Sequence, residues 1–107
     1  MQRYAQIIHL HPEAEAAYKR YHQAVWPEVL SKITECNIRN YSIFLRDHTL
    51  FGYFEYIGSD FAVDMAKMAA DPKTQEWWAI MNLMQKPFED RAEGEWWASM
   101  KEVFHLD

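Results

Sequence analysis

A hairpin in the middle of the chain limits its possible folds more than any other feature. Residues 39–46 and 49–57 are both predicted to be strands, and only the two residues 47–48 separate them. In the first strand every second residue from Tyr41 to Leu45 is apolar, so these side chains share one face. Two strands joined by so short a turn pair in an antiparallel manner. The sequence therefore predicts an antiparallel sheet around which the rest of the chain is arranged.

A strand pattern and a helix pattern precede this hairpin. Residues 2–10 form a strand-like run that ends before Pro12, and proline is well tolerated at the first position of a helix. Residues 13–35 then carry apolar side chains at helical spacing. Pro27 lies inside this run and removes a backbone donor. We therefore expect the helix to kink or split near Trp26.

The segment after the hairpin contains two helix starts and one more strand pattern. Ser or Asp at 59–60 is placed to cap a helix over residues 61–70. The pair Asp71-Pro72 begins another helix, which ends before Pro87. After a polar loop, residues 98–105 are predicted to form the final strand.

The predicted order of elements is strand, helix, strand, strand, helix, strand. This is the order of the α+β ferredoxin-like fold, in which helices cover one face of an antiparallel sheet. Apolar side chains on the uncovered face commonly pair with a second copy of the chain. The length of 107 residues suits one domain over residues 1–107, and we expect a homodimer of the dimeric α/β barrel type.

Composition argues against several classes of function. The formal net charge is −5 with the basic residues scattered among acidic ones, so no nucleic-acid partner is expected. No apolar run approaches the ~18 residues of a membrane span, and the N-terminus does not resemble a signal peptide, which together predict a cytoplasmic protein. The single cysteine, Cys36, has no partner, and His9 and His11 lack a supporting acid or thiol, so no metal site is expected.

The aromatic content is high for so small a core. Phe, Tyr and Trp make up 16% of the residues, so some rings are expected to line a pocket or an interface. Trp77 and Trp78 are adjacent on a predicted helix and point in different directions. Either one lies in the core and one at an interface, or both are platforms for the C–H face of a sugar. A second doublet, Trp96 and Trp97, is better explained by packing or a dimer contact.

One titratable residue lies among these aromatic residues. Tyr18 and His22 are four residues apart, so on a helix they occupy the same face. The spacing alone is also that of an ordinary half-buried helix face, which is the commoner case. As a functional pair, His22 would act as a general acid or base near neutral pH, and Tyr18 would hydrogen-bond a substrate hydroxyl.

Four motifs along the chain are specific when their order and spacing are taken together. They are Tyr18 and His22 followed by Trp-Pro-Glu at 26–28, Asn-Tyr-Ser-Ile at 40–43, the Trp77-Trp78 pair, and Glu-Val-Phe-His-Leu at 102–106. With these motifs the chain resembles the L-rhamnose mutarotase family over nearly its full length. The resemblance implies that His22 matches the family's catalytic proton donor. It also implies four sugar-binding residues: Tyr18, Tyr41, Trp77 and Trp78.

The same resemblance implies an aldose 1-epimerase that interconverts the α and β anomers of a 6-deoxy-hexose as a dimer, without cofactor or metal. L-Rhamnose is the first candidate substrate. The apolar run from Ala79 to Pro87 leaves L-fucose as the alternative. Two other classes share the expected topology: a dimeric ferredoxin-like monooxygenase and a non-catalytic dimeric barrel module. Anomer exchange without any cofactor would distinguish the epimerase from both.

Overall fold

The computed structural model describes residues 1–107, and its elements follow the predicted order. The elements are β1 (Gln2–Leu10), a 3₁₀ turn (Pro12–Ala14), α1 (Glu15–Gln23), α2 (Pro27–Glu35), β2 (Ile38–Arg46), β3 (Thr49–Tyr56), α3 (Phe61–Ala70), α4 (Pro72–Met84), β4 (Gln85–Lys86) and β5 (Ala98–Met100).

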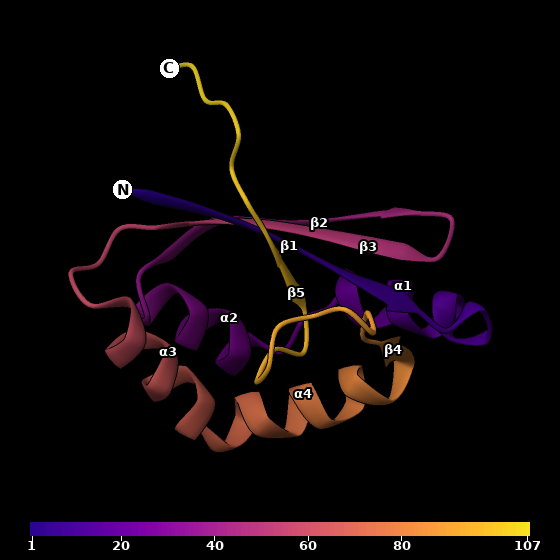
Figure 1. The fold of residues 1–107 in the computed structure, drawn as a ribbon. Coiled ribbons are helices and arrows are strands. Elements are labelled where there is room, and N and C mark those ends of the chain that lie inside the picture. The colour runs from indigo at the N-terminus through magenta and orange to yellow at the C-terminus, as the bar shows by residue number, and fades with distance from the viewer.

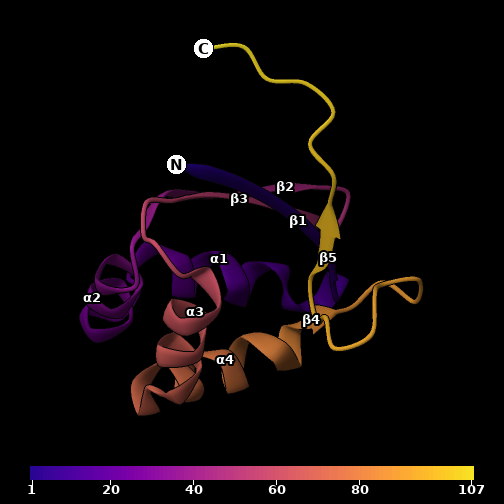
Figure 2. The same ribbon diagram turned by 60° about the vertical axis from the view of Figure 1, so that its left-hand side comes forward.

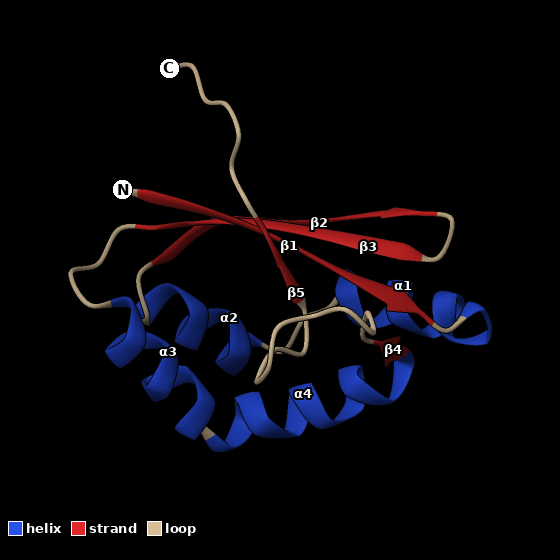
Figure 3. Ribbon diagram, viewed as in Figure 1, coloured by secondary structure: helices blue, strands red, loops and turns tan.

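All the α-helices lie on the same face of one antiparallel sheet (Figures 1 and 3). The strand order is β2-β3-β1-β4, and β5 also pairs with β1. β1 therefore lies between the central hairpin and the two short C-terminal strands. This arrangement confirms the α+β ferredoxin-like fold that the element order predicts.

The central hairpin has the predicted strands and turn. Both turn residues have positive φ, 49° at Asp47 and 58° at His48. This backbone geometry matches the twist of paired strands and is the one favoured in two-residue hairpins. Pairing becomes irregular between Arg39 and Ser42, where Asn40 has a φ of 51°. Such a bulge bends the strand and changes the direction of neighbouring side chains.

Local signals also place the helix boundaries. α1 ends at Gln23 and α2 begins at Pro27, so the long helical pattern splits where the proline predicts. The carboxylate of Asp60 accepts a hydrogen bond from the backbone N–H of Val63 at 3.2 Å and caps α3. Asp71 caps α4 in the same way, accepting from the N–H of Thr74 at 3.0 Å.

The predicted final strand over residues 98–105 is wrong in its extent. Only β5, three residues long, pairs with β1, and its register places Met100 opposite Ala5. Continued in this register, the pairing would reach the end of β1 at Gln2 after three more residues, so Phe104 and the residues beyond it have no partner strand. The segment after Met100 leads away from the helices and past the sheet (Figure 2).

The fourth position of the sheet is an interrupted strand. β4 pairs with the end of β1, where Gln85 lies opposite Leu10, and β5 pairs further along, where Ala98 lies opposite Ile7. Residues 87–97 leave the sheet between these two short pairings. This excursion brings the second tryptophan doublet to the helical side of the sheet, as the next subsection describes.

Both faces of the sheet carry apolar side chains, but only one is covered by helices (Figure 1). Ile8 and Leu50, on the inner face, are buried against the helices. On the outer face Ile7, Phe51 and Phe44 lie opposite one another across three strands. Phe44 is 61% exposed, so this row is open to a partner.

Candidate active site

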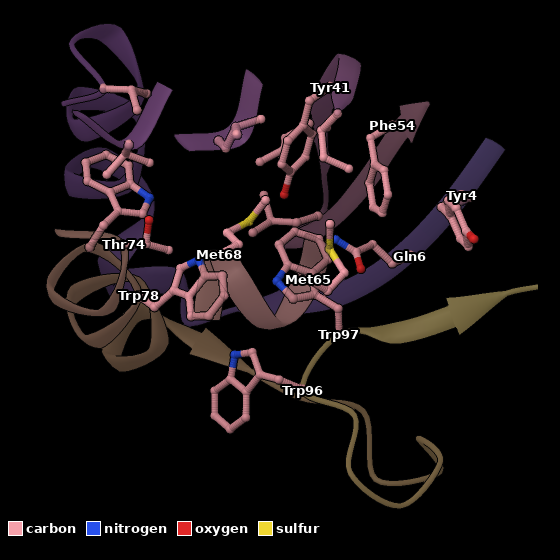
Figure 4. A pocket seen from close by; sticks show the side chains of 18 of the residues that line it. Tyr4, Gln6, Tyr41, Phe54, Met65, Met68, Thr74, Trp78, Trp96 and Trp97 are labelled. Atoms are coloured by element: carbon pink, nitrogen blue, oxygen red, sulfur yellow. The ribbon is translucent and has the colours of Figure 1, made fainter. Parts of the chain in front are cut away.

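A cavity of about 1190 Å³ lies between the inner face of the sheet and the helices (Figure 4). Most of its lining side chains are apolar, as is usual for a small-molecule site. All five site residues predicted from the sequence line it: Tyr18, His22, Tyr41, Trp77 and Trp78. The fold therefore brings together groups from α1, β2 and α4 that are far apart in the chain.

The imidazole of His22 is held between two aromatic rings. It stacks on Tyr18 with a centroid distance of 4.3 Å and meets Trp77 edge-on at 5.5 Å. Its Nδ1 lies 2.8 Å from the backbone carbonyl of Tyr18. A carbonyl oxygen can only accept a hydrogen bond, so Nδ1 carries the hydrogen. Nε2 is therefore the nitrogen available to exchange a proton with a ligand.

Tyr18 is a buried residue with a polar end, and only 4% of its surface is exposed. Its phenol oxygen accepts a hydrogen bond from Nε2 of Gln85 at 3.1 Å. Burial raises the pKa of Tyr18 above its ordinary value, and the nearby Tyr41 hydroxyl raises it further. The hydrogen bond from Gln85 lowers the pKa in part. The phenol is therefore neutral throughout the physiological range and acts as a hydrogen-bonding group.

Tyr41 reaches the cavity from the bulged part of β2. The residue is 40% exposed because one side of its ring faces solvent, but the hydroxyl points into the cavity (Figure 4). Burial of the hydroxyl raises the pKa of Tyr41 to about 12, and a hydrogen bond with Gln6 lowers it in part. A second neutral phenol thus faces the cavity from the sheet.

The two adjacent tryptophans of α4 have different environments. Trp77 is 6% exposed, belongs to the core cluster and meets Trp26 edge-on at 5.2 Å. Trp78 is 39% exposed and lines the cavity from its open side. Trp77 is thus a core ring and Trp78 is not, and both rings border the cavity.

The structure contains no metal-like cluster and no membrane-length helix. No three His, Cys, Asp or Glu side chains converge as metal ligands do. None of the helices combines the length and the apolar character needed to cross a bilayer.

Comparison with known proteins identifies the family of the chain that forms this site. A family model described as L-rhamnose mutarotase matches residues 3–106. The chain belongs to the L-rhamnose mutarotase family. This membership agrees with the four motifs that carry the resemblance at the level of sequence.

Individual relatives span the whole chain. An L-rhamnose mutarotase from Oceanobacillus iheyensis is 32% identical over 109 residues, which cover 100% of each chain. An L-fucose mutarotase from Xanthomonas campestris pv. campestris is 34% identical and covers 99% of this chain and 89% of its own. The solved structure of an L-rhamnose mutarotase from Formosa agariphila has a TM-score of 0.79 with 24% identity and covers 100% of both chains.

Two cavity residues of this L-rhamnose mutarotase family member, and one buried residue beside them, were not predicted from the sequence. Trp96 and Trp97 both line the cavity, although the sequence suggested packing or a dimer contact for them. The ring of Trp97 lies over Gly52 of β3, where an added Cβ would be 3.4 Å from it. Gln85 is buried between Tyr18 and Trp96. The interrupted fourth strand places all three residues here, and no local pattern in the sequence indicates that interruption.

Proposed function

We propose that the protein is an aldose 1-epimerase that interconverts the α and β anomers of a 6-deoxy-hexose, with L-rhamnose as the first candidate. The observation that carries this proposal is the position of His22. His22 lines a cavity that aromatic rings and neutral phenols also border, and its Nε2 has no hydrogen-bond partner in the protein. A proton-transfer group among stacking surfaces and hydrogen-bonding groups is what ring opening of a small sugar requires. Membership of the L-rhamnose mutarotase family supports the same reaction.

Anomer exchange involves only proton transfer and bond rotation. Ring opening breaks the bond between C1 and the ring oxygen, the ring oxygen gains a proton, and the anomeric hydroxyl loses one to become the aldehyde oxygen. Rotation about the C1–C2 bond then presents the other face of the aldehyde for closure. We assign to Nε2 of His22, protonated on both ring nitrogens, the proton given to the ring oxygen. Water takes the proton that the anomeric hydroxyl loses, and closure reverses both transfers. Such transfer typically contributes ~10²–10⁴ in rate and needs no cofactor.

The remaining predicted residues bind the sugar in this proposal. Trp78, the more exposed ring of the pair, stacks on the C–H face, while Trp77 holds the imidazole and closes the apolar wall. The phenols of Tyr18 and Tyr41 hydrogen-bond the sugar hydroxyls from two sides. The methyl group of a 6-deoxy sugar suits the apolar part of the lining.

L-Fucose is the second candidate substrate, because the L-fucose mutarotase from Xanthomonas campestris is about as similar to this chain as the L-rhamnose enzyme. Magnetisation exchange between the α and β anomeric protons, measured by NMR at equilibrium, distinguishes the two. We expect the protein to accelerate exchange for L-rhamnose more than for L-fucose or common hexoses. A larger acceleration for L-fucose would reverse the substrate assignment, and spontaneous rates for every sugar would contradict the proposed reaction.

We also propose that the protein is a homodimer that pairs through the outer face of its sheet. The row of Ile7, Phe51 and Phe44 supplies an apolar surface on that face. Apolar side chains at 103, 104 and 106 are also exposed and available to a partner copy.

Light scattering tests this assembly directly. We expect twice the mass of the chain for the wild-type protein and a smaller mass for Phe44→Glu. Leu83→Glu, which changes an exposed apolar residue of α4 on the helical side, is the matched control and should remain dimeric. A wild-type monomer at micromolar concentration would contradict the dimer.

The cytoplasm is the proposed location. Cys36, the single cysteine, is buried and free, which is compatible with a reducing compartment. Cell fractionation should recover the protein with soluble cytoplasmic markers, and recovery with membranes would contradict this.

A further inference from the structure

Gln85 is a buried polar residue to which the reaction described above gives no role. It is the first residue of β4, directly after α4, and only 5% of its surface is exposed. Both ends of its amide are hydrogen-bonded. Nε2 donates to the phenol oxygen of Tyr18 at 3.1 Å, and Oε1 accepts from the indole Nε1 of Trp96 at 2.9 Å. Gln85 therefore links the excursion between β4 and β5 to a residue that faces the cavity.

The chemistry of these three groups fixes the direction of the two hydrogen bonds. An indole N–H can only donate, so the end of the Gln85 amide that faces Trp96 must be the oxygen. The NH₂ end is then turned toward Tyr18, and because it can only donate, the phenol oxygen must accept. Tyr18 therefore does not donate its own O–H to Gln85. The protein supplies no other hydrogen-bond partner for that O–H.

We propose that Gln85 is a positioning residue that fixes Tyr18 as a hydrogen-bond donor to the bound sugar. The inference deepens the proposed function and rests on it. With its oxygen held by Gln85, the phenol presents its hydrogen toward the cavity and selects a sugar oxygen that can accept. Because the Tyr18 ring stacks on His22, the same contact also holds the surface against which the imidazole rests.

The titratable groups near Gln85 come from several elements. On β1 it lies opposite the apolar Leu10, which His9 and His11 flank, and Lys86 follows it in β4. Tyr18 and His22 face it from α1, directly and through the stacked ring. Tyr41 of β2 lies near Tyr18, and Glu95, next to Trp96, is hydrogen-bonded to Ser99. The neighbouring part of α4 contributes the uncharged residues Trp77, Met81 and Met84. A titratable group introduced at position 85 would therefore be bonded only to neutral partners.

Gln85→Glu tests the direction of the hydrogen bond between residue 85 and Tyr18. An ionised carboxylate only accepts, so it would draw the Tyr18 O–H toward itself and away from the sugar. A protonated carboxyl can donate to Tyr18 again, and burial raises the pKa of such a group. We expect anomer exchange about tenfold slower than wild type at pH 8, with a smaller deficit as the pH falls. Spontaneous exchange is subtracted, and each rate is divided by the wild-type rate at the same pH so that pH effects common to both proteins cancel.

Two further variants separate the effect of hydrogen-bond direction from the effect of side-chain packing at position 85. Gln85→Met keeps the shape of the side chain without hydrogen bonds, and we expect a loss of about threefold that is the same at every pH. Gln2→Glu makes the same charge change at an exposed position at the start of β1, where a carboxylate can still accept from Tyr4, and it should exchange anomers like the wild type. A Gln85→Glu deficit that does not change with pH, or no deficit at all, would overturn the proposal.

A double-mutant cycle tests whether Gln85 acts through Tyr18. We expect Tyr18→Phe combined with Gln85→Met to be no slower than Tyr18→Phe alone. Losses that multiply would overturn the proposal while leaving the sugar-binding role of Tyr18 intact. Wild-type rates in Tyr18→Phe would overturn both roles. Failure of the proposed function itself is distinguishable, because the wild-type protein would then not accelerate exchange for any sugar.

Discussion

The two ends of the sheet each have a buried tyrosine, but the two hydroxyls are bonded in opposite ways. Tyr56, at the end of β3 near α3, donates to Oδ2 of Asp64 at 2.5 Å and accepts from the backbone N–H of Asp60 at 3.0 Å. Tyr18, near α4, accepts only from Gln85. The first hydroxyl uses both its donor and its acceptor capacity within the protein. The second donates its hydrogen to no group in the protein.

The surroundings of Tyr56 show that its end of the molecule is structural. Asp64 also accepts from the side-chain amide of Asn37 at 2.9 Å and lies 3.5 Å from the ammonium of Lys67. A Cβ at Gly58 would lie 2.3 Å from the Tyr56 oxygen, so the turn there fits only glycine. These contacts connect several elements around one carboxylate, and neither Tyr56 nor Asp64 lines the cavity.

The difference indicates how to distinguish a binding tyrosine from a structural one. Both are buried and both connect a helix to the sheet, so burial alone does not separate them. A charged acceptor such as Asp64 consumes the O–H in a strong internal bond. A neutral donor such as the Gln85 amide supports the oxygen and leaves the hydrogen free. The predictions below test this contrast.

The largest expected effect is at the two tryptophans beside the cavity. Trp77→Ala removes a buried ring from the core and should cost ~3–5 kcal/mol of unfolding free energy. Trp78→Ala should cost about 1 kcal/mol and chiefly weaken sugar binding. Urea unfolding and sugar titration by NMR measure the two effects. If both variants unfold and bind sugar like the wild type, neither ring has the position that the structure gives it.

The next effect concerns acid stability at the Tyr56 end. Hydrogen bonds from Tyr56 and Asn37 hold the pKa of Asp64 below its usual value. The lowered pKa means that Asp64 contributes stability above its unfolded-state pKa of ~4, and this contribution is lost as pH falls through the folded-state value. Asp64→Asn should therefore melt several degrees below wild type at pH 7, with the difference shrinking in acid. Asp90→Asn, at an exposed site, is the control. Equal melting temperatures for Asp64→Asn and the wild type at pH 7 would refute the stabilising role of Asp64.

The smallest effects come from the tyrosines themselves and give the sharpest contrast. Tyr18→Phe should slow anomer exchange by ~0.5–1.5 kcal/mol of activation free energy, about the value of one hydrogen bond. It should also lower the melting temperature, because the buried amide of Gln85 loses its acceptor. Tyr56→Phe should lower the melting temperature and leave exchange unchanged. Exchange rates and thermal melts on both variants decide the matter, because a similar pattern in the two would remove the distinction between the ends.

Features set by adjacent residues could be predicted from the sequence. The hairpin turn at 47–48 and the helix break before Pro27 depend on local backbone geometry, and both are confirmed. The final strand was overextended because its length depends on where β1 begins, which is a property of distant residues. A run of alternating apolar side chains does not reveal that its partner strand has ended.

The residues of the candidate site also divide into those that adjacent sequence predicts and those that depend on distant residues. Tyr18 and His22 could be paired from the sequence because one helix turn separates them. Gln85 and Trp96 enter the site only because β1 pairs with two short strands that an excursion separates. The only local signal for Gln85 is an amide at the end of an apolar helix, and its meaning depends on Tyr18, which is distant in the chain.

The central claim is that His22 transfers the proton, and anomer exchange by folded His22→Ala protein tests it most directly. Circular dichroism and light scattering first establish that the variant folds and assembles like the wild type. NMR exchange on L-rhamnose should then be close to the spontaneous rate, a loss on the order of 10²–10⁴. His22→Gln should do little better, because an amide forms hydrogen bonds but does not exchange a proton. Wild-type exchange in His22→Ala would contradict the account and place the acid elsewhere in the cavity.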